Sequence, residues 1–117
     1  MAYMNYKDLT VWQKAMDLVS EVYRLVKKLP EEEKYALADQ MRRSAVSIPS
    51  NIAEGKGRKT DNEFKNFLGI ANGSLMELET QLLICIRLKY LDESETHLAF
   101  SLLDEVNRMI TTLMLKI

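Results

Sequence analysis

The sequence contains little of what several protein classes require. It has one cysteine, two prolines and four glycines in 117 residues. Because Cys85 has no second cysteine to pair with, a secreted, disulfide-stapled fold is disfavoured. The scarcity of turn-forming residues argues against an all-β chain. No apolar run approaches the ~18 residues of a membrane span, and the first nine residues lack the apolar core of a signal peptide. We therefore expect one cytoplasmic, helical domain over residues 1–117, with no membrane contact.

Charge of one sign is also lacking. The chain is 47% hydrophobic and 28% charged, as is usual for a globular protein, and its net charge is −1. A chain with this balance has no overall attraction for a polyanion. Any binding of nucleic acid would have to come from a local patch, or from patches summed over several subunits.

What the sequence does contain is helical periodicity. Apolar residues recur at intervals of three and four and predict helices over about residues 10–29, 31–54, 61–89 and 93–117. Thr10 with Gln13 fits a capping box that opens the first helix, and Pro30 closes it. The expected core stripe of this helix, filled in by Ala15 and Val22, consists of Trp12, Met16, Val19, Tyr23, Val26 and Leu29.

The other boundaries have similar signals. The carboxylates of residues 31–33 suit a helix N-terminus, and Gly55 suits the position after a helix end. Thr60 and Asp92, each followed three residues later by a glutamate, predict two further caps. Pro49 lies inside the second helix and is expected to kink it. Four such helices with short connections predict an all-α fold, an antiparallel up-down-up-down four-helix bundle.

Residues typical of catalysis or metal binding are scarce. His97 is the only histidine and has no glutamate three residues before it, so a di-iron site is disfavoured. Cys85 lies in an apolar run and is expected to be an inert core residue. Gly55-Lys56-Gly57 follows a helix, whereas phosphate loops precede one. We expect no enzyme, no catalytic residue, no metal, no cofactor and no small-molecule substrate.

The second helix has an unusual surface. A polar stripe beside its apolar face consists of Gln40, Ser44, Ser47, Asn51 and Glu54. A further stripe of small side chains predicts a subunit interface that includes Val46, Pro49, Ser50 and Ala53. The polar stripe fits equally well against a neighbouring helix of the same chain. Glu77, on the third helix, is a possible ion-pair partner of Arg42 or Arg43.

Basic residues gather in sequence around the connection between the second and third helices. The candidate phosphate contacts are Arg42, Arg43, Lys56, Arg58 and Lys59. The alternative is a solvated loop, since nearby carboxylates dilute the charge. Trp12 and Tyr23 are expected in the core and not as base-stacking platforms.

Three segments carry a family resemblance. Residues 42–55, the opening of residues 8–15 and the pattern of residues 64–77 closely resemble four-helix bundle proteins of 23S ribosomal RNA intervening sequences. A more distant likeness is to the accessory protein of diversity-generating retroelements. The resemblance covers essentially the whole chain.

The resemblance implies an up-down-up-down bundle that assembles into a ring-shaped homopentamer. It also implies a non-enzymatic protein associated with RNA or with an RNA-handling protein. The alternative is a protein–protein interaction scaffold that does not bind nucleic acid. Five copies of a weak basic patch would gain avidity for one RNA.

Overall fold

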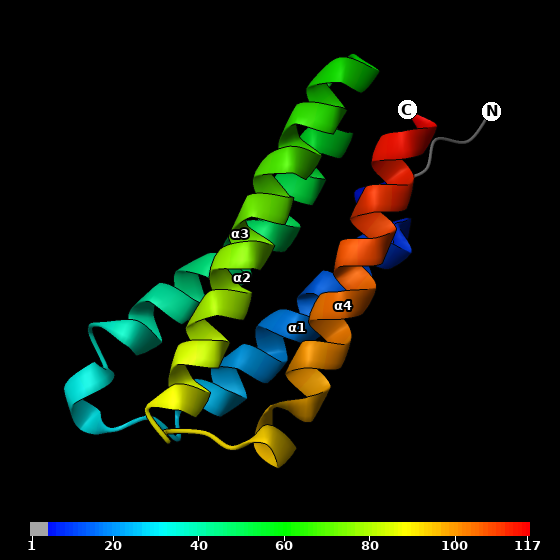
Figure 1. The fold of residues 1–117 in the computed structure, drawn as a ribbon. Coiled ribbons are helices and arrows are strands. Elements are labelled where there is room, and N and C mark those ends of the chain that lie inside the picture. The colour runs from blue at the N-terminus through cyan, green and yellow to red at the C-terminus, as the bar shows by residue number, and fades with distance from the viewer. Residues whose placement is uncertain (1–4) are drawn as a thin grey trace.

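The structure, a computed structural model, describes residues 5–117 and consists of four α-helices and two short 3₁₀ helices (Figure 1). The α-helices are α1 (Thr10–Val26), α2 (Leu37–Lys56), α3 (Asp61–Arg87) and α4 (Glu93–Lys116). The 3₁₀ helices are η1 (Tyr6–Asp8) and η2 (Glu31–Glu33). No strand occurs among the described residues, so the predicted all-α class is confirmed.

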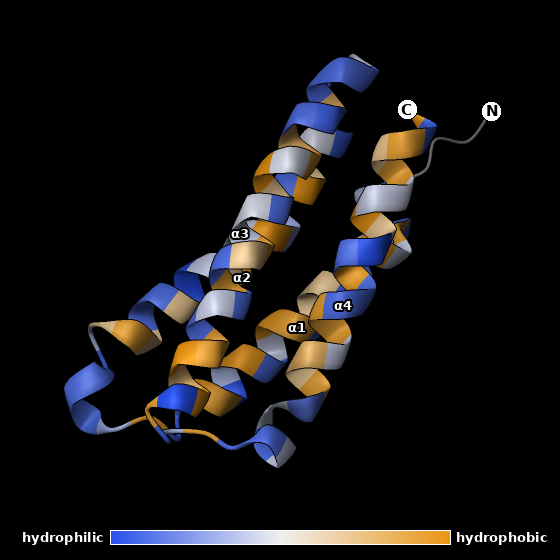
Figure 2. Ribbon diagram, in the orientation of Figure 1, coloured by the Kyte–Doolittle hydropathy of each residue, from blue (hydrophilic) through white to orange (hydrophobic). Residues whose placement is uncertain are grey.

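Each helix packs beside the one that precedes it, and α4 returns to α1. Neither diagonal pair of helix backbones, α1 with α3 or α2 with α4, comes into contact within residues 5–117. Figure 1 shows that the chain reverses direction at every connection, which is the expected up-down-up-down order. In Figure 2 the end of the bundle at the α2–α3 turn is hydrophilic. The bundle measures 50 × 25 × 20 Å.

The start of the first helix differs from the prediction. Leu9 is the N-cap residue of α1, and Thr10 is its first helical residue and does not cap it with its side chain. The polar side chains cap η1 instead, where the Lys7 N–H donates to Asn5 Oδ1 at 2.9 Å. The Gln13 side chain, expected in the capping box, donates to the Lys7 carbonyl at 2.9 Å. The capping box predicted for α1 is therefore absent, and a capping box occurs one element earlier, at η1.

The second predicted helix begins six residues too early. The acidic residues 31–33 form the separate turn η2, and α2 begins only at Leu37. Glu33 accepts hydrogen bonds from the Leu37 N–H at 3.3 Å and from the Tyr90 hydroxyl at 2.9 Å. The Tyr90 bond, which raises the pKa of that phenol, ties η2 to the α3–α4 turn. These bonds fix η2 outside the axis of α2.

The sequence predicted that Gly55 would follow the end of α2, but Gly55 is buried inside this helix. A Cβ atom at this position would lie 2.6 Å from Cβ of Phe67 and 3.0 Å from Cδ1 of Phe64. The glycine therefore allows the close approach of α3, and α2 ends at Lys56. Pro49 is buried in the middle of α2, and the kink expected there remains a prediction.

The two later caps are confirmed. The Glu63 N–H donates to Thr60 Oγ1 at 3.2 Å, which opens α3. At α4 the capping box is complete, because Asp92 accepts from the Glu95 N–H at 2.8 Å and donates its own N–H to Glu95 at 3.0 Å. Lys89, with a φ of 64°, turns the chain out of α3 two residues after the helix ends.

The core stripe of α1 is displaced from the predicted one. Val11, Leu18 and Leu25 are buried, whereas Met16 and Tyr23 are each 42% exposed. The sequence contains two neighbouring apolar stripes on this helix, about 100° apart, and periodicity alone does not choose between them. Packing buries the stripe that carries the two leucines. Among the apolar residues that helical spacing assigns to the core faces of α2, α3 and α4, Leu88 and Leu98 are about half exposed and the others are buried or partly buried.

Candidate interaction surfaces

The predicted basic contacts at the start of α2 are already paired. Arg43 Nε lies 3.0 Å from Asp39 Oδ2, and Arg42 Nη2 lies 3.8 Å from Asp39 Oδ1. Arg42 also donates to the Lys34 carbonyl at 3.1 Å. One carboxylate therefore partly neutralises both arginines.

The remaining basic contacts lie at the other end of α2, next to the α2–α3 turn. Arg58 pairs with Glu54 at 2.9 Å and lies 4.8 Å from the centre of the Phe67 ring. Lys56 lies 5.8 Å from the centre of the Phe64 ring, in cation–π geometry. The ammonium groups of Lys56 and exposed Lys59 have no ion-pair partner within residues 5–117, although the Lys59 backbone N–H donates to Glu63 at 3.3 Å.

The five basic residues therefore do not form one patch. Arg42 lies in the second turn of α2 and Lys56 is its last residue, so several helical turns separate them. Two separate groups of basic side chains lie at the two ends of α2. Only the group at the α2–α3 turn keeps cations that no carboxylate holds.

The predicted subunit interface is mostly accessible. Val46 is 41% exposed, Ser50 is exposed and Ala53 is half-buried. Pro49 is buried within the bundle, so its side chain does not belong to the outer surface. The other three residues follow one another along the outer side of α2 with short side chains.

A second apolar surface lies on α3, and the sequence reasoning missed it. Its exposed members are Ile70, Met76, Leu83, Ile84 and Leu88. Gly69 and Gly73 lie on the same outer face, and a Cβ atom at either glycine would meet nothing within 4 Å. The sequence did contain a signal for this surface, since the apolar residues 70 and 84 are two heptads apart and lie on the helix face opposite to the core. This outer face of α3 is wide and uncovered in the single chain.

The predicted polar stripe of α2 faces α3 along a seam that opens into a groove. The Ser47 and Ser74 hydroxyls form a hydrogen bond of 2.8 Å between the two helices. Asn51 donates to both the carbonyl and the hydroxyl of Ser47, at 2.8 and 2.9 Å. The groove has a volume of about 400 Å³, and it is lined by Gln40, Arg43, Ser44, Ser47, Ser74, Glu77 and Gln81. The stripe therefore serves helix packing and leaves a polar groove at the surface.

Glu77 does not pair with Arg42 or Arg43, although the sequence suggested that it could. Both arginines are held by Asp39. Glu77 shares the groove with Arg43 and is exposed.

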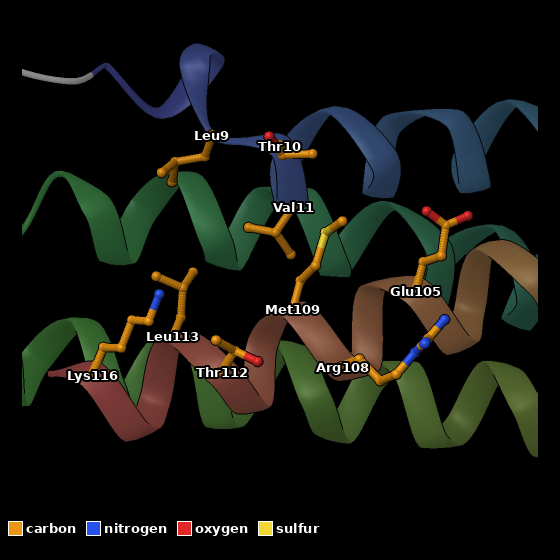
Figure 3. Close-up of a pocket in the computed structure, with 9 residues that line it drawn as sticks. All are labelled: Leu9, Thr10, Val11, Glu105, Arg108, Met109, Thr112, Leu113 and Lys116. Atoms are coloured by element: carbon orange, nitrogen blue, oxygen red, sulfur yellow. The ribbon is translucent and has the colours of Figure 1, made fainter.

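A larger pocket, of about 580 Å³, lies between the start of α1 and the end of α4 (Figure 3). Val11 and Met109 point toward one another across it, and Leu9 and Leu113 line it further along (Figure 3). Glu105 at its edge pairs with Lys14 at 3.4 Å. The lining is largely apolar, so the pocket suits an apolar group.

Cys85 and His97, the residues considered for catalysis or metal binding, differ in their exposure. Cys85 is buried with its Sγ 3.6 Å from Sδ of Met41, and burial raises the pKa of its thiol to about 11. His97 is exposed in the first turns of α4. Residues 5–117 contain no group of three histidine, cysteine or carboxylate side chains placed to hold a metal ion. Across the same residues, none of the helices combines the length and apolarity of a membrane span.

Fold and surfaces together define the class, an all-α four-helix bundle with exposed apolar faces and a polar groove. The chain belongs to the 23S rRNA-intervening sequence protein family, whose model matches residues 7–112. It is similar to a protein of unknown function from the S23 ribosomal protein family of Bacteroides thetaiotaomicron. That crystal structure matches with a TM-score of 0.83 and 25% identity, over 90% of this chain and 98% of that chain. A comparison with curated proteins gives no match. The family resemblance found in the sequence is therefore confirmed.

Proposed function

We propose that this chain is a non-enzymatic, self-associating binding protein of the cytoplasm, and that its partner is RNA or an RNA-handling protein. The observation that carries the proposal is the accessible apolar face that runs along α3 from Ile70 to Leu88, together with the accessible short side chains around Val46 on α2. Large exposed apolar faces on a small protein are typical of interaction sites.

Two different surfaces on one chain suit a ring. In a head-to-tail assembly, one surface of each subunit packs against a different surface of the next subunit. The ring closes when the rotation that relates neighbouring subunits is a whole fraction of 360°. A homopentamer, which the family resemblance implies, is such a ring. The α2 and α3 surfaces are our candidates for the two sides of its repeated interface.

The RNA part of the proposal is supported by the cations at the α2–α3 turn. The ammonium groups of Lys56 and Lys59 have no ion-pair partner within residues 5–117. Lys56 ends α2 and Lys59 lies in the α2–α3 turn, which is the hydrophilic end of the bundle in Figure 2. A ring would gather five copies of this group, and avidity would then compensate for the low charge of each. The family's description, which names 23S rRNA, supports RNA as the first ligand to test.

Light scattering tests the assembly. We expect an oligomer for the wild type and loss of mass for Val46→Glu, because a buried charge at an apolar interface is strongly unfavourable. Ser101→Glu, on an exposed position of α4, is the matched control and should keep the wild-type mass. A monomeric wild type at high concentration would refute self-association.

Fluorescence anisotropy with a labelled RNA hairpin tests the ligand. We expect affinity that falls steeply with salt, and a loss in the double variant Lys56→Gln, Lys59→Gln. The charge-matched control is Lys27→Gln with Lys89→Gln, since both lysines are exposed in connections at the other end of the bundle. If low salt gives no binding, the second candidate, a protein-interaction scaffold, is favoured by the same apolar faces. A protein partner captured after nuclease treatment would support it.

A further inference from the structure

The polar groove between α2 and α3 contains a buried acceptor without a partner. Gln81 is only 9% exposed, and no group within residues 5–117 donates a hydrogen bond to its Oε1 atom. Ser47 and Ser74, on either side of the groove, already satisfy one another. A buried acceptor without a donor costs free energy, and a rotation of the terminal amide would turn Oε1 toward a donor that enters the groove.

A carboxylate lies next to this amide. Glu77 precedes Gln81 by one helical turn, which places the two side chains on the same face of α3. Glu77 is exposed and has no cation within ion-pair distance among the described residues. Arg43, on the opposite wall of the groove, is held 3.0 Å from Asp39. The groove therefore offers a charged and a neutral acceptor side by side.

Two neighbouring acceptors, one of them charged, match a planar cation with several donors. A guanidinium group has five N–H donors in a fixed fork and can bond to both oxygens at once. An ammonium group is a point charge on a flexible stem and has no such geometric fit. The chemistry of the groove thus favours an arginine side chain.

The chain itself carries one arginine that is available. Five of the six arginines lie within 4.0 Å of a carboxylate, namely Arg24, Arg42, Arg43, Arg58 and Arg108. Arg87 is exposed and has no acidic partner within residues 5–117. It lines an apolar cleft with Leu83 and Ile84 on the outer face of α3. Arginine among apolar side chains is enriched at protein interfaces.

We propose that the groove is a guanidinium-binding site and that Arg87 of a second copy of this chain occupies it. Arg87 does not reach the groove of its own chain, because it lies more than two helical turns beyond Glu77 along α3. The second-copy assignment rests on the proposed self-association. The guanidinium specificity of the groove does not.

A charge exchange tests the assignment by sedimentation equilibrium. We expect Glu77→Arg and Arg87→Glu each to weaken self-association roughly tenfold, and the double variant to regain most of it. The matched controls are Glu79→Arg, on the opposite side of α3, and Arg108→Glu, which is paired on α4. A monomeric wild type would refute the proposed function together with this occupant. An oligomeric wild type that Arg87→Glu leaves intact would overturn the occupant alone.

Gln81→Met separates binding from folding. The substitution removes the acceptor but keeps the volume, so we expect unchanged or higher stability in urea together with weaker self-association. A residue with a purely structural role would lose stability instead. Equal loss of stability and association would overturn the proposal.

L-argininamide tests the groove without a second copy. In ¹⁵N NMR spectra we expect the probe at millimolar concentration to shift the Gln81 side-chain amide signals, and roughly fivefold weaker binding to Glu77→Gln. Glu79→Gln, with the same change of charge, should bind as the wild type does. Binding that responds to Glu77 while Arg87→Glu has no effect on mass would assign the site to another protein's arginine. If the probe shifts no signal of the groove, the guanidinium site is wrong.

Discussion

The α1–α4 pair and the α2–α3 pair are held together by different chemistry. Between α1 and α4, Lys14 lies 3.4 Å from Glu105, and Lys28, just beyond α1, lies 3.0 Å from Glu95. Between α2 and α3 no ion pair occurs among the described residues, and the shortest hydrogen bond between them is the neutral one of Ser47 with Ser74.

This difference supports the proposal that the α2–α3 side of the molecule binds the partner. On the α1–α4 side, four charged side chains are engaged in ion pairs within the chain, namely Lys14, Lys28, Glu95 and Glu105. On the α2–α3 side Arg42 and Arg43 pair with Asp39 of the same helix. Glu77 and Lys56 have no ion-pair partner within residues 5–117, and Gln81 Oε1 accepts no hydrogen bond there. The same side carries the exposed apolar face of α3. We therefore regard the outer side of the α2–α3 pair as the interaction side.

The largest expected effect comes from the core that both pairs share. Leu18 on α1 and Leu75 on α3 are fully buried. We expect Leu18→Ala and Leu75→Ala each to lower the free energy of unfolding by about 3 kcal/mol, measured by urea denaturation with one transition. Met16→Ala, on the exposed stripe of α1, should cost less than about 1 kcal/mol. Two separate transitions would mean that the pairs are independent units.

Gly55→Ala should act on the α2–α3 pair alone. The added Cβ would lie 2.6 Å from Cβ of Phe67, so the helices must separate locally. We expect a loss of about 2 kcal/mol by chemical denaturation. Gly69→Ala is the control, because its Cβ would meet nothing within 4 Å and alanine favours the helix by up to ~1 kcal/mol. Stabilisation by both substitutions would contradict the close approach at Gly55.

Two double-mutant cycles compare the links directly. For Ser47→Ala and Ser74→Ala we expect a coupling of about 1 kcal/mol that does not change with salt, because neither group is charged. For Lys14→Met and Glu105→Gln we expect about 0.5 kcal/mol, decreasing in 1 M NaCl. Urea denaturation at two salt concentrations provides both values. A coupling between Ser47 and Ser74 that changes with salt would contradict the proposed difference between the two helix pairs.

The smallest effect concerns pH and the helix caps. Bonds from the backbone N–H of Glu95 to Asp92, and of Asp92 to Glu95, lower the pKa of both carboxyls. Because these folded-state pKa values lie below the unfolded ones, the stability they contribute is present above about pH 4 and is lost as pH falls further. Urea midpoints at pH 7 and pH 3 should show this loss, and Asp92→Asn should reduce it. Thr60→Ala removes an uncharged cap, so its cost should be the same at both pH values.

The sequence predicted the fold class and the later boundaries because those signals are local. Thr60 and Asp92 cap helices through residues three positions away, which a sequence pattern contains in full. The α1 face and the role of Gly55 depend on what packs against them, and no local pattern contains that. Periodicity placed Met16 in the core because an equally apolar stripe lies one residue away.

The candidate interaction surfaces could also be predicted only in part, because some of their features are local in sequence and others depend on the fold. Val46 and the polar stripe were visible as a helix face with unusual residues. The basic group was misleading, because Arg42 and Lys56 are close in sequence yet lie toward opposite ends of one extended helix. The acceptor on Gln81 could not be found, since only the fold reveals that no donor faces it.

The absence of diagonal contacts has a consequence for how the bundle folds. In residues 5–117 each α-helix packs beside its chain neighbours, and the pairings between distant segments are the return of α4 to α1 and the contact of η1 with α2. Closing the long loop between α1 and α4 carries a larger entropic cost than forming the α2–α3 hairpin, whose helices are four residues apart. The α2–α3 hairpin is therefore expected to form early and the α1–α4 contact late. The α2–α3 hairpin, which carries the proposed interaction surface, is thus expected to form before α4 packs against α1.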